Sequence, residues 1–415
     1  MDNLRVREPF HASPKIRRSE GPEPETIPLQ DPAGFQHEVP TRSRCVKTFA
    51  RPCRPSNRLG RAAQLGPDDA LKSTPRFPSY VIVYDPRFLD HVPSPLHVER
   101  PDRLRSIVER LEREGLFHGV ETPPTATIAD LRRVHRGSYV ELVRSLGEGF
   151  LDPETAVHRG TFDIAGLAAG GVLLATRSAV RDGHPTIALV RPPGHHAGPD
   201  YGGGFCYLNN VAIAAAEQVA AGRRVAILDY DAHHGNGTRD IFAENPAVLY
   251  VSTHEYGIYP GTGPAEDTGT GEGRGFTVNI PFTAGCGDAS YVAALDSVIE
   301  PILGQFRPDV VLVSLGIDAH YRDPLTSLTL SSPGYVDLVK RSAALAARLC
   351  ANRFTIALEG GYHLEALSEV IAGVVAGIEG RSIPLALTDV LDDKGRGREA
   401  IEATKRAHRD FWNLR

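Results

Sequence analysis

Residues 228–238 read LDYDAHHGNGT, and they set both the architecture and the chemistry expected of this chain. The apolar, β-branched run just before them predicts a buried parallel strand over 224–229. Open α/β sheets place their ligands at the carboxyl ends of such strands. Because residues i and i+2 share one face of a strand, Asp231 and His233 can aim a carboxylate oxygen and an imidazole nitrogen at a common point. This pair suits Zn²⁺ and similar ions, so we expect further ligands elsewhere in the chain.

The composition is that of an ordinary globular protein. Of the 415 residues, 41% are apolar and 23% are charged, and the net charge is −5. This mild negative charge gives no electrostatic footprint for nucleic acid, and no apolar run predicts a membrane span or a secretory signal. Five cysteines without CxxC spacing favour reduced thiols in a cytoplasmic protein.

Three regions are expected along the chain. Residues 1–78 are rich in proline and arginine and lack apolar periodicity, so we predict a poorly ordered extension. Within it, Cys45 and Cys53 have no second Cys or His pair nearby and are interpreted as incidental thiols. Residues 79–380 form the predicted folded domain, and residues 381–415 form an extension with an amphipathic helix near 397–412.

Strands and helices alternate over the predicted domain. This alternation predicts a doubly wound α/β fold, with a mainly parallel sheet and helices on both of its faces. The expected strands are 79–84, 186–190, 224–229, 248–252, 310–314 and 355–358, and the expected helices start near 101 and span 163–180, 210–221 and 288–303.

Polar residues gather at four predicted strand ends, namely 191–196, 229–236, 318 and 359–362. A ligand site at the carboxyl edge of the sheet explains why the polar residues follow the strand ends so regularly. Asp318 would complete an Asp-His-Asp set with Asp231 and His233, and three protein ligands with one open position are the pattern of a catalytic zinc site. Taken alone, Asp318 is equally compatible with a helix cap or a turn.

Two adjacent histidines, His195 and His196, lie in a Pro-Gly-bounded loop after strand 186–190. A hydrolytic metal site needs a base close by, and an imidazole held by a hydrogen-bonding partner is a standard one. Asp229 and Asn236 are placed to orient one histidine each. The alternatives are that the two histidines ligate a metal or lie in an ordinary surface loop.

Two further features concern the binding of a substrate. Tyr362 follows a Gly-Gly turn at a strand end and could donate its hydroxyl to a developing oxyanion, although a tyrosine there is more often a packing residue. The loop GGGFCY at 202–207 lacks the Lys-Ser/Thr of a phosphate loop. Its backbone at Gly204 and the aromatic wall at Phe205 suit a narrow tunnel for an alkyl chain, or else form an ordinary loop into helix 210–221.

Six motifs appear in a fixed order along the chain: RPPGHHA (191–197), GFCYLNN (204–210), DYDAHHGNGT (229–238), YPGTG (259–263), GIDAH (316–320) and EGGY (359–362), preceded by HVERP (97–101) and VH (134–135). Together they resemble the zinc-dependent histone deacetylase family, in its bacterial and archaeal branch of acetoin-utilisation-type and acetylpolyamine amidohydrolase-like proteins. The resemblance covers about 79–380, implies a deacetylase catalytic domain there, and implies the arginase/deacetylase fold.

The resemblance implies a role for each matching residue. One Zn²⁺ per chain is held by the positions of Asp231, His233 and Asp318. The tandem histidines match His195, whose partner is Asp229, and His196, which acts as general base and then acid. Tyr362 matches the residue that polarises the acyl carbonyl.

Other positions match the surroundings of that site. Asp229, together with the backbone oxygens of Asp231 and His233 and the region of Ser252, resembles a structural K⁺ site. Phe205 and Tyr259 resemble the tunnel walls. Weaker local matches place Arg100 near an acetate exit channel and make Asp152 the rim carboxylate that holds the substrate backbone.

Three positions depart from parts of the family. Asn236 stands where some members have Asp, so the support for His196 is uncharged. Glu359 replaces a glycine of the eukaryotic first class. Leu325 stands where a polyamine-selective relative carries an acidic gatekeeper, and a leucine cannot attract a second ammonium group. This difference favours acetyl-lysine, or another monocationic or neutral amide, over a polyamine.

We therefore predict zinc-dependent hydrolysis of an acetylated amine, with acetyl-lysine in a protein or peptide, or a small acetylated amine, as the substrate. The alternatives are an acetylpolyamine amidohydrolase, an arginase-like dimanganese ureohydrolase, which would need Asp-x-Asp at position 318, and a non-catalytic binding module. We expect no nucleic acid or membrane partner. The oligomeric state, including a homo-oligomer, stays open.

Overall fold

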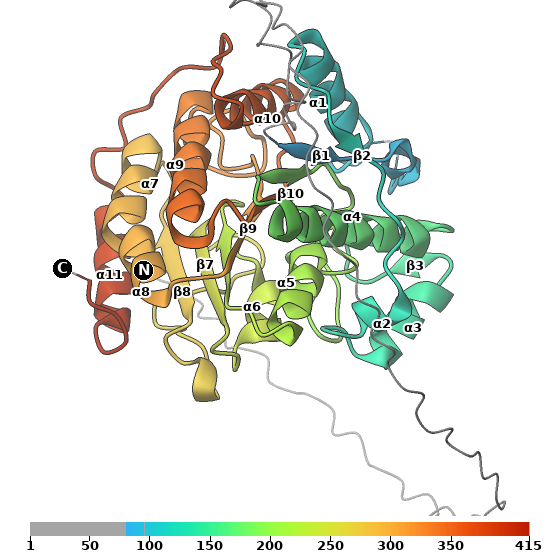
Figure 1. Ribbon diagram of the computed structural model, residues 1–415, viewed down its shortest axis with the longest axis horizontal. Coiled ribbons are helices and arrows are strands. Elements are labelled where there is room, and N and C mark those ends of the chain that lie inside the picture. Colours follow the sequence, from blue (N-terminus) through green and yellow to red (C-terminus); the bar gives the residue numbers. More distant parts are fainter. Residues whose placement is uncertain (1–79, 95, 415) are drawn as a thin grey trace, which may run out of the picture. The chain divides into compact units, whose positions relative to one another are not determined.

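A single parallel sheet organises the structure, a computed structural model that describes residues 80–94 and 96–414 (Figure 1). Its eight strands run in the order β2-β1-β5-β10-β9-β6-β7-β8, and every neighbouring pair is parallel. The predicted doubly wound α/β architecture is therefore confirmed. The predictions for residues 1–78, including Cys45 and Cys53, lie outside the described residues.

Most strands are short and buried on both faces, as expected for a parallel sheet covered by helices. The sheet consists of β1 (Val81–Val83), β2 (Val120–Glu121), β5 (Thr186–Ala188), β6 (Val225–Asp229), β7 (Val248–Glu255), β8 (Thr277–Phe282), β9 (Val310–Leu315) and β10 (Phe354–Leu358), and a separate hairpin is formed by β3 (Gly149–Phe150) and β4 (Ala156–Val157).

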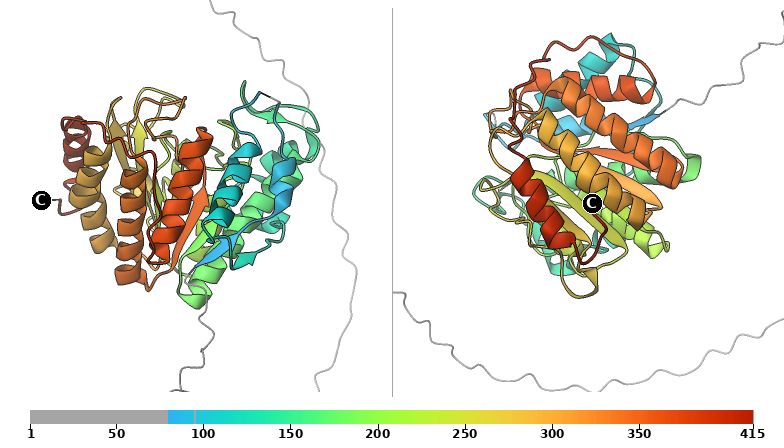
Figure 2. Two further views of the ribbon diagram at one scale, coloured as in Figure 1. Left: turned by 90° about the horizontal axis from the view of Figure 1, so that it is seen from above. Right: turned by 90° about the vertical axis from the view of Figure 1, so that its left-hand side faces the viewer.

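Helices cover the sheet in two layers. One layer holds α4 (Thr161–Asp182), α5 (Asn210–Ala220) and α6 (Asn236–Phe242), with the short α2 (Ile128–Leu131) and α3 (Gly137–Ser145) beside it. The other layer holds α1 (Asp102–Arg113), α7 (Asp288–Ala294), α8 (Glu300–Phe306), α9 (Ser332–Cys350) and α10 (Leu364–Ile378). The adjacent helices α10, α9 and α7 are seen as a row in Figure 2. The remaining helix, α11 (Arg398–His408), packs against β8 and α7.

The helix expected over 288–303 is present but is not a continuous α-helix. After α7, the chain forms a π-helical turn over Leu295–Ile299 and then continues as α8. Pro301 lies in the first turn of α8 and has no backbone N–H to donate to the preceding turn. The hydrogen-bond pattern shifts just before this proline, as π-bulges do.

Sequence reasoning missed strand β8. The segment Thr277–Phe282 contains Pro281 and alternates polar and apolar residues, so it does not look like the other buried strands. It forms the edge of the sheet, where a proline is tolerated. Its pairing also extends β7 to Glu255, three residues beyond the predicted end.

Helix α4 is the single described helix that is long and apolar enough to cross a membrane. Its apolar window is 72% buried inside the protein, which is the position of a core helix. The helix ends at Gly183, whose positive φ of 67° provides a left-handed cap.

Candidate active site

The order of the strands explains why distant polar segments meet. Strands β5, β10, β9 and β6 are neighbours in the sheet, and all four point the same way. Their carboxyl ends therefore lie in a row, and they deliver the segments 191–196, 359–362, 316–318 and 229–236. These are the four polar clusters that the sequence places at strand ends.

The three predicted metal ligands lie together. One ligand atom from each of Asp231, His233 and Asp318 lies within 4.8 Å of the other two. The His233 Nδ1 lies 3.2 Å from Asp231 Oδ1 and 2.9 Å from Asp318 Oδ2. Both carboxylates are buried, and burial together with Asp231 raises the pKa of Asp318 to about 7. Two buried carboxylates this close repel each other as anions, so the cluster has the chemistry of a cation site.

Glycines next to the cluster make this close approach possible. A Cβ atom on Gly316 would lie 2.0 Å from Asp231 Oδ2, and one on Gly360 would lie 2.4 Å from Asp318 Oδ2. The backbone N–H of Gly360 donates to Asp231 Oδ2 at 2.8 Å, and that of Ala232 donates to Asp318 Oδ1 at 2.7 Å. These bonds fix the orientation of both carboxylates.

The two adjacent histidines have the predicted partners. His195 Nδ1 lies 3.2 Å from Asp229 Oδ2, and His196 Nδ1 lies 2.8 Å from Asn236 Oδ1. Burial alone would lower the pKa of His195, but Asp231 and Asp229 outweigh burial and raise it to about 10. Burial and the neighbouring His195 hold the pKa of His196 well below its usual value. The pair therefore separates into a cationic and a neutral imidazole, the arrangement typical of acid–base sites.

A narrow cavity of about 60 Å³ leads to these groups. One water needs about 10–15 Å³ of such a cavity, so the cavity accommodates a group of only a few heavy atoms. Its lining residues are Glu154, Pro193, His195, His196, Gly204, Phe205, Asp231, His233, Tyr259, Leu325, Gly360 and Tyr362. The Phe205 and Tyr362 rings meet edge to face at 5.9 Å, and Tyr259 meets His196 in the same way at 4.9 Å. The tunnel residues expected from the resemblance thus line one cavity.

Asp152 lies behind the wall of this cavity rather than among its lining residues. Its Oδ2 accepts hydrogen bonds from the Gly204 N–H at 2.9 Å and the Tyr259 hydroxyl at 3.3 Å. Its Oδ1 accepts the Glu154 N–H at 3.0 Å. Asp152 therefore ties the β3–β4 hairpin to the glycine-rich loop, and the lining residue contributed by this hairpin is Glu154.

The structure does not place Arg100 among the residues that line the cavity. Its side chain is 44% exposed and lies 3.4 Å from Asp102 at the surface. Arg103, one helical turn later, is buried instead, with its Nε donating to the Gly361 oxygen at 2.7 Å and its guanidinium 5.1 Å from the centre of the Tyr362 ring. A signal was available, because Arg103 shares the i, i+4, i+8 face with Ile107 and Leu111, whereas Arg100 precedes the helix.

The parallel sheet and the acid–histidine cluster at its carboxyl edge define an α/β protein of the arginase/deacetylase class. Residues 97–378 match the histone deacetylase domain, and the chain belongs to that family.

An archaeal protein, a bacterial protein and a solved structure are similar to this chain and agree with this assignment. A probable deacetylase of Archaeoglobus fulgidus is 39% identical over 351 residues, which are 80% of this chain and 98% of that protein. The histone deacetylase-like amidohydrolase of Pseudomonas aeruginosa is 37% identical over 64% of this chain and 72% of its own length. The crystal structure of the HDA15 HD domain superposes with a TM-score of 0.73 at 35% identity, covering 80% of this chain and 96% of that one.

Proposed function

We propose that this chain is a zinc-dependent deacetylase, which hydrolyses the amide of an acetylated amine and releases acetate and the free amine. One observation carries the proposal: two members of an Asp-His-Asp cluster, Asp231 and His233, line one narrow cavity together with a neutral histidine and a tyrosine. Membership of the deacetylase family supports hydrolysis of this kind.

The donor set fits Zn²⁺. Two carboxylate oxygens and one imidazole nitrogen, from Asp231, Asp318 and His233, are three protein ligands of the types that zinc accepts. A divalent cation would also offset the repulsion between the two buried carboxylates. A Zn²⁺ ion held by these three residues would supply a Lewis acid for polarising the amide carbonyl.

His196 is the residue placed to move protons. Its Nδ1 faces an amide oxygen of Asn236, which can only accept, so Nδ1 carries the proton and Nε2 keeps a free lone pair. A neutral imidazole in this tautomer takes a proton from the attacking water at Nε2 and then gives it to the leaving amine. His195, held cationic by Asp229 and Asp231, stabilises negative charge and does not serve as the base.

Tyr362 is the donor for the carbonyl oxygen as that oxygen gains negative charge. Within residues 80–94 and 96–414, no protein group hydrogen-bonds its hydroxyl, and the residue lines the cavity. Burial raises the pKa of Tyr362 well above its usual value, so the phenol keeps its proton for donation. Asp323 fixes its backbone, because Asp323 Oδ2 accepts the Tyr362 N–H at 2.7 Å.

The small cavity supports an acetyl group, and the apolar Leu325 at its opening supports acetyl-lysine or a small monoacetylated amine over a polyamine. The K⁺ ion near Asp229 and the cytoplasmic location stay predictions from the sequence. Potassium analysis of the purified protein after dialysis against a sodium buffer would test the first.

A hydrolysis panel with the purified zinc form tests the proposed function. The panel contains acetyl-lysine peptides, acetylputrescine, acetylspermidine and simple acetamides, with acetate release as the measurement. We expect turnover of acetyl-lysine peptides or a monoacetylated amine, with one zinc per chain. Absence of acetate release from every amide, or two manganese ions per chain with activity on a guanidinium substrate, would overturn the proposal.

A further inference from the structure

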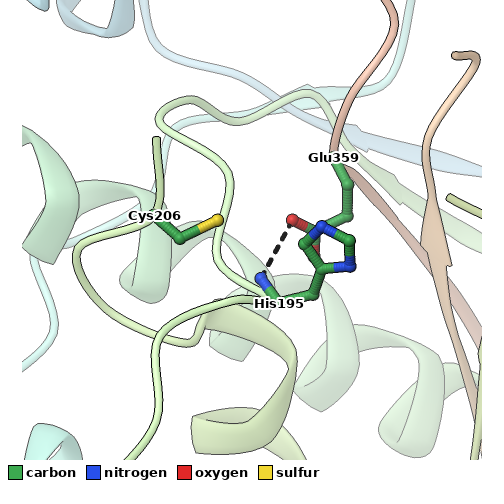
Figure 3. A group of neighbouring side chains, drawn as sticks. All are labelled: His195, Cys206 and Glu359. Carbon is green, nitrogen blue, oxygen red and sulfur yellow. Dashed lines mark hydrogen bonds between the residues drawn. The ribbon is translucent and has the colours of Figure 1, made fainter. Parts of the chain in front are cut away.

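The proposed mechanism gives no role to Glu359, a buried carboxyl residue whose side chain contacts His195. Its side chain is 1% exposed, and it comes from the end of β10. Figure 3 shows its carboxylate between His195 and Cys206, with the backbone nitrogen of His195 directed at one oxygen. A buried carboxylate is costly unless its oxygens find partners, so its partners indicate its purpose.

The carboxylate ties three strand ends together. Glu359 Oε2 accepts the backbone N–H of Gly194 at 2.7 Å and that of His195 at 3.3 Å, in the loop after β5. Its Oε1 accepts the hydroxyl of Ser314 at 3.1 Å, in β9. The loop that carries the two catalytic histidines is therefore held by the side chain of the residue that directly follows β10.

The backbone around Glu359 holds the rest of the site. The next residue, Gly360, donates its N–H to Asp231 Oδ2 at 2.8 Å, and Tyr362 follows two residues later. Arg103 donates to the carbonyl oxygens of Glu359 and Gly361. The tyrosine turn, one metal-ligand carboxylate and the histidine loop thus share one anchor.

We propose that Glu359 is a positioning residue, which sets the His195–His196 loop in register with Asp231 and Tyr362 through its hydrogen bonds to Gly194 and His195. This inference rests on the proposed function for its kinetic consequence. Its structural consequence, the anchoring of the loop, is independent of that function.

The side chains of His195, Cys206 and Glu359 could instead form a second metal site. One ligand atom from each of them lies within 4.8 Å of the other two. The contacts favour the hydrogen-bonded arrangement. Two backbone N–H groups already point at Glu359 Oε2, and His195 Nδ1 is engaged with Asp229. The Cys206 thiol lies 3.4 Å from the Gly204 oxygen as a donor.

Three variants test the anchor. Glu359→Ala leaves two buried N–H groups without an acceptor, while Glu359→Gln keeps an oxygen for them and places its amide toward Ser314. The matched control is Glu369→Ala, because Glu369 is also 1% exposed and accepts two backbone N–H groups, from Ala386 at 2.6 Å and Leu387 at 2.8 Å. Glu369 lies in α10, outside the cavity lining.

Hydrogen exchange measured by mass spectrometry tests whether Glu359 protects the backbone amides of the histidine loop, and it needs no substrate. Because Pro192 and Pro193 have no amide hydrogen, the peptide 191–198 reports mainly on Gly194, His195 and the residues after them. We expect faster exchange in this peptide for Glu359→Ala, and wild-type exchange for Glu359→Gln and Glu369→Ala. Unchanged exchange in Glu359→Ala would overturn the proposal, even for a protein without activity on the panel.

Kinetics and metal content complete the test. A small displacement of a catalytic group costs up to about 10²-fold in rate, so we expect kcat of Glu359→Ala to fall about 10- to 100-fold with KM within about threefold. Glu359→Gln should recover kcat to within about fivefold, and zinc should stay at one per chain in all variants. A second metal ion in the wild type that Glu359→Ala and Glu359→Gln both lose would overturn the anchor in favour of a metal site.

Discussion

The carboxyl edge of the central strands and the edge closed by α11 both bury polar groups, but in opposite ways. At the first edge, the carboxylates of Asp231 and Asp318 lie buried in one cluster with His233. At the second, two neutral pairs hold the chain: the Thr404 hydroxyl donates to the Asn279 backbone oxygen at 2.7 Å, and the Trp412 indole N–H donates to the Gly275 oxygen at 2.7 Å.

This difference implies that residues at the first edge determine activity, whereas residues at the α11 edge determine the stability of the fold. Neutral pairs and apolar contacts at the α11 edge cover strand β8, which would otherwise present unpaired backbone groups. The clustered carboxylates of Asp231 and Asp318 cost free energy of folding unless a cation compensates them. Substitution of these ligand carboxylates should therefore remove activity without lowering the stability of the metal-free protein, and substitutions at the α11 edge should do the reverse.

The largest effect is expected for Asp318→Asn. Asparagine keeps an oxygen for the Ala232 N–H but removes one of the three ligands and one buried charge. We expect the zinc content to fall below about a tenth of an ion per chain. We expect kcat/KM to fall about 10³-fold or more, because a bound metal ion contributes several kcal/mol to stabilisation of the transition state. Elemental analysis and steady-state kinetics measure both.

The stability of the same variant sharpens the comparison. The melting temperature of metal-free Asp318→Asn should equal or exceed that of the metal-free wild type, because one source of repulsion is gone. The matched control is Asp393→Asn, since Asp393 is a buried carboxylate that accepts the Ser290 N–H at 2.7 Å and does not line the cavity. It should lose stability and keep zinc. Full zinc in Asp318→Asn would remove that residue from the ligand set.

Tyr362→Phe is expected to have the next largest effect. The change removes one hydroxyl and keeps the ring, which packs against Phe205 and beneath Arg103. Loss of one oxyanion donor typically lowers kcat about 10²–10³-fold, or roughly 3–4 kcal/mol, and KM should change much less. Kinetics, melting temperature and zinc content are measured together. A near-normal kcat would exclude Tyr362 from the mechanism, and lost zinc or lost fold would make its role structural.

The sequence predicts the central edge well because local patterns determine it. Apolar runs identify β6, β9 and β10, and parallel strands must carry their following residues to the same edge, so Asp231, His233 and Asp318 could be grouped without coordinates. Phe205 follows from its glycine-rich loop, whereas Tyr259 is expected only from the family resemblance; both line the cavity.

What the sequence does not reveal depends on contacts between distant residues. Glu359 meets partners 165 and 45 positions away, and no spacing rule indicates such a contact. Arg100 and Arg103 differ by a single helical turn, so their burial depends on where α1 begins. Strand β8 was not predicted, because its proline and polar residues are acceptable only in the outermost strand of the sheet, which α11 covers.

The smallest effect on activity, and a large one on stability, is expected for Ile401→Ala in α11. Ile401 is 5% exposed and belongs to the core, on the face of the helix that packs toward β8 and α7. Truncation of a buried isoleucine to alanine costs about 2–4 kcal/mol, through lost transfer free energy and the cavity left behind. This is similar in size to the barrier change expected for Tyr362→Phe, but it should appear in the free energy of unfolding in urea.

The rate constant kcat and the zinc content should stay at wild-type values, because α11 contributes no residue to the cavity. Arg406→Ala, on the exposed side of the same helix, is the matched control and should change the free energy of unfolding by less than about 0.5 kcal/mol. A parallel loss of kcat in folded Ile401→Ala would show that the two edges are coupled, and the separation of chemistry from stability would then fail.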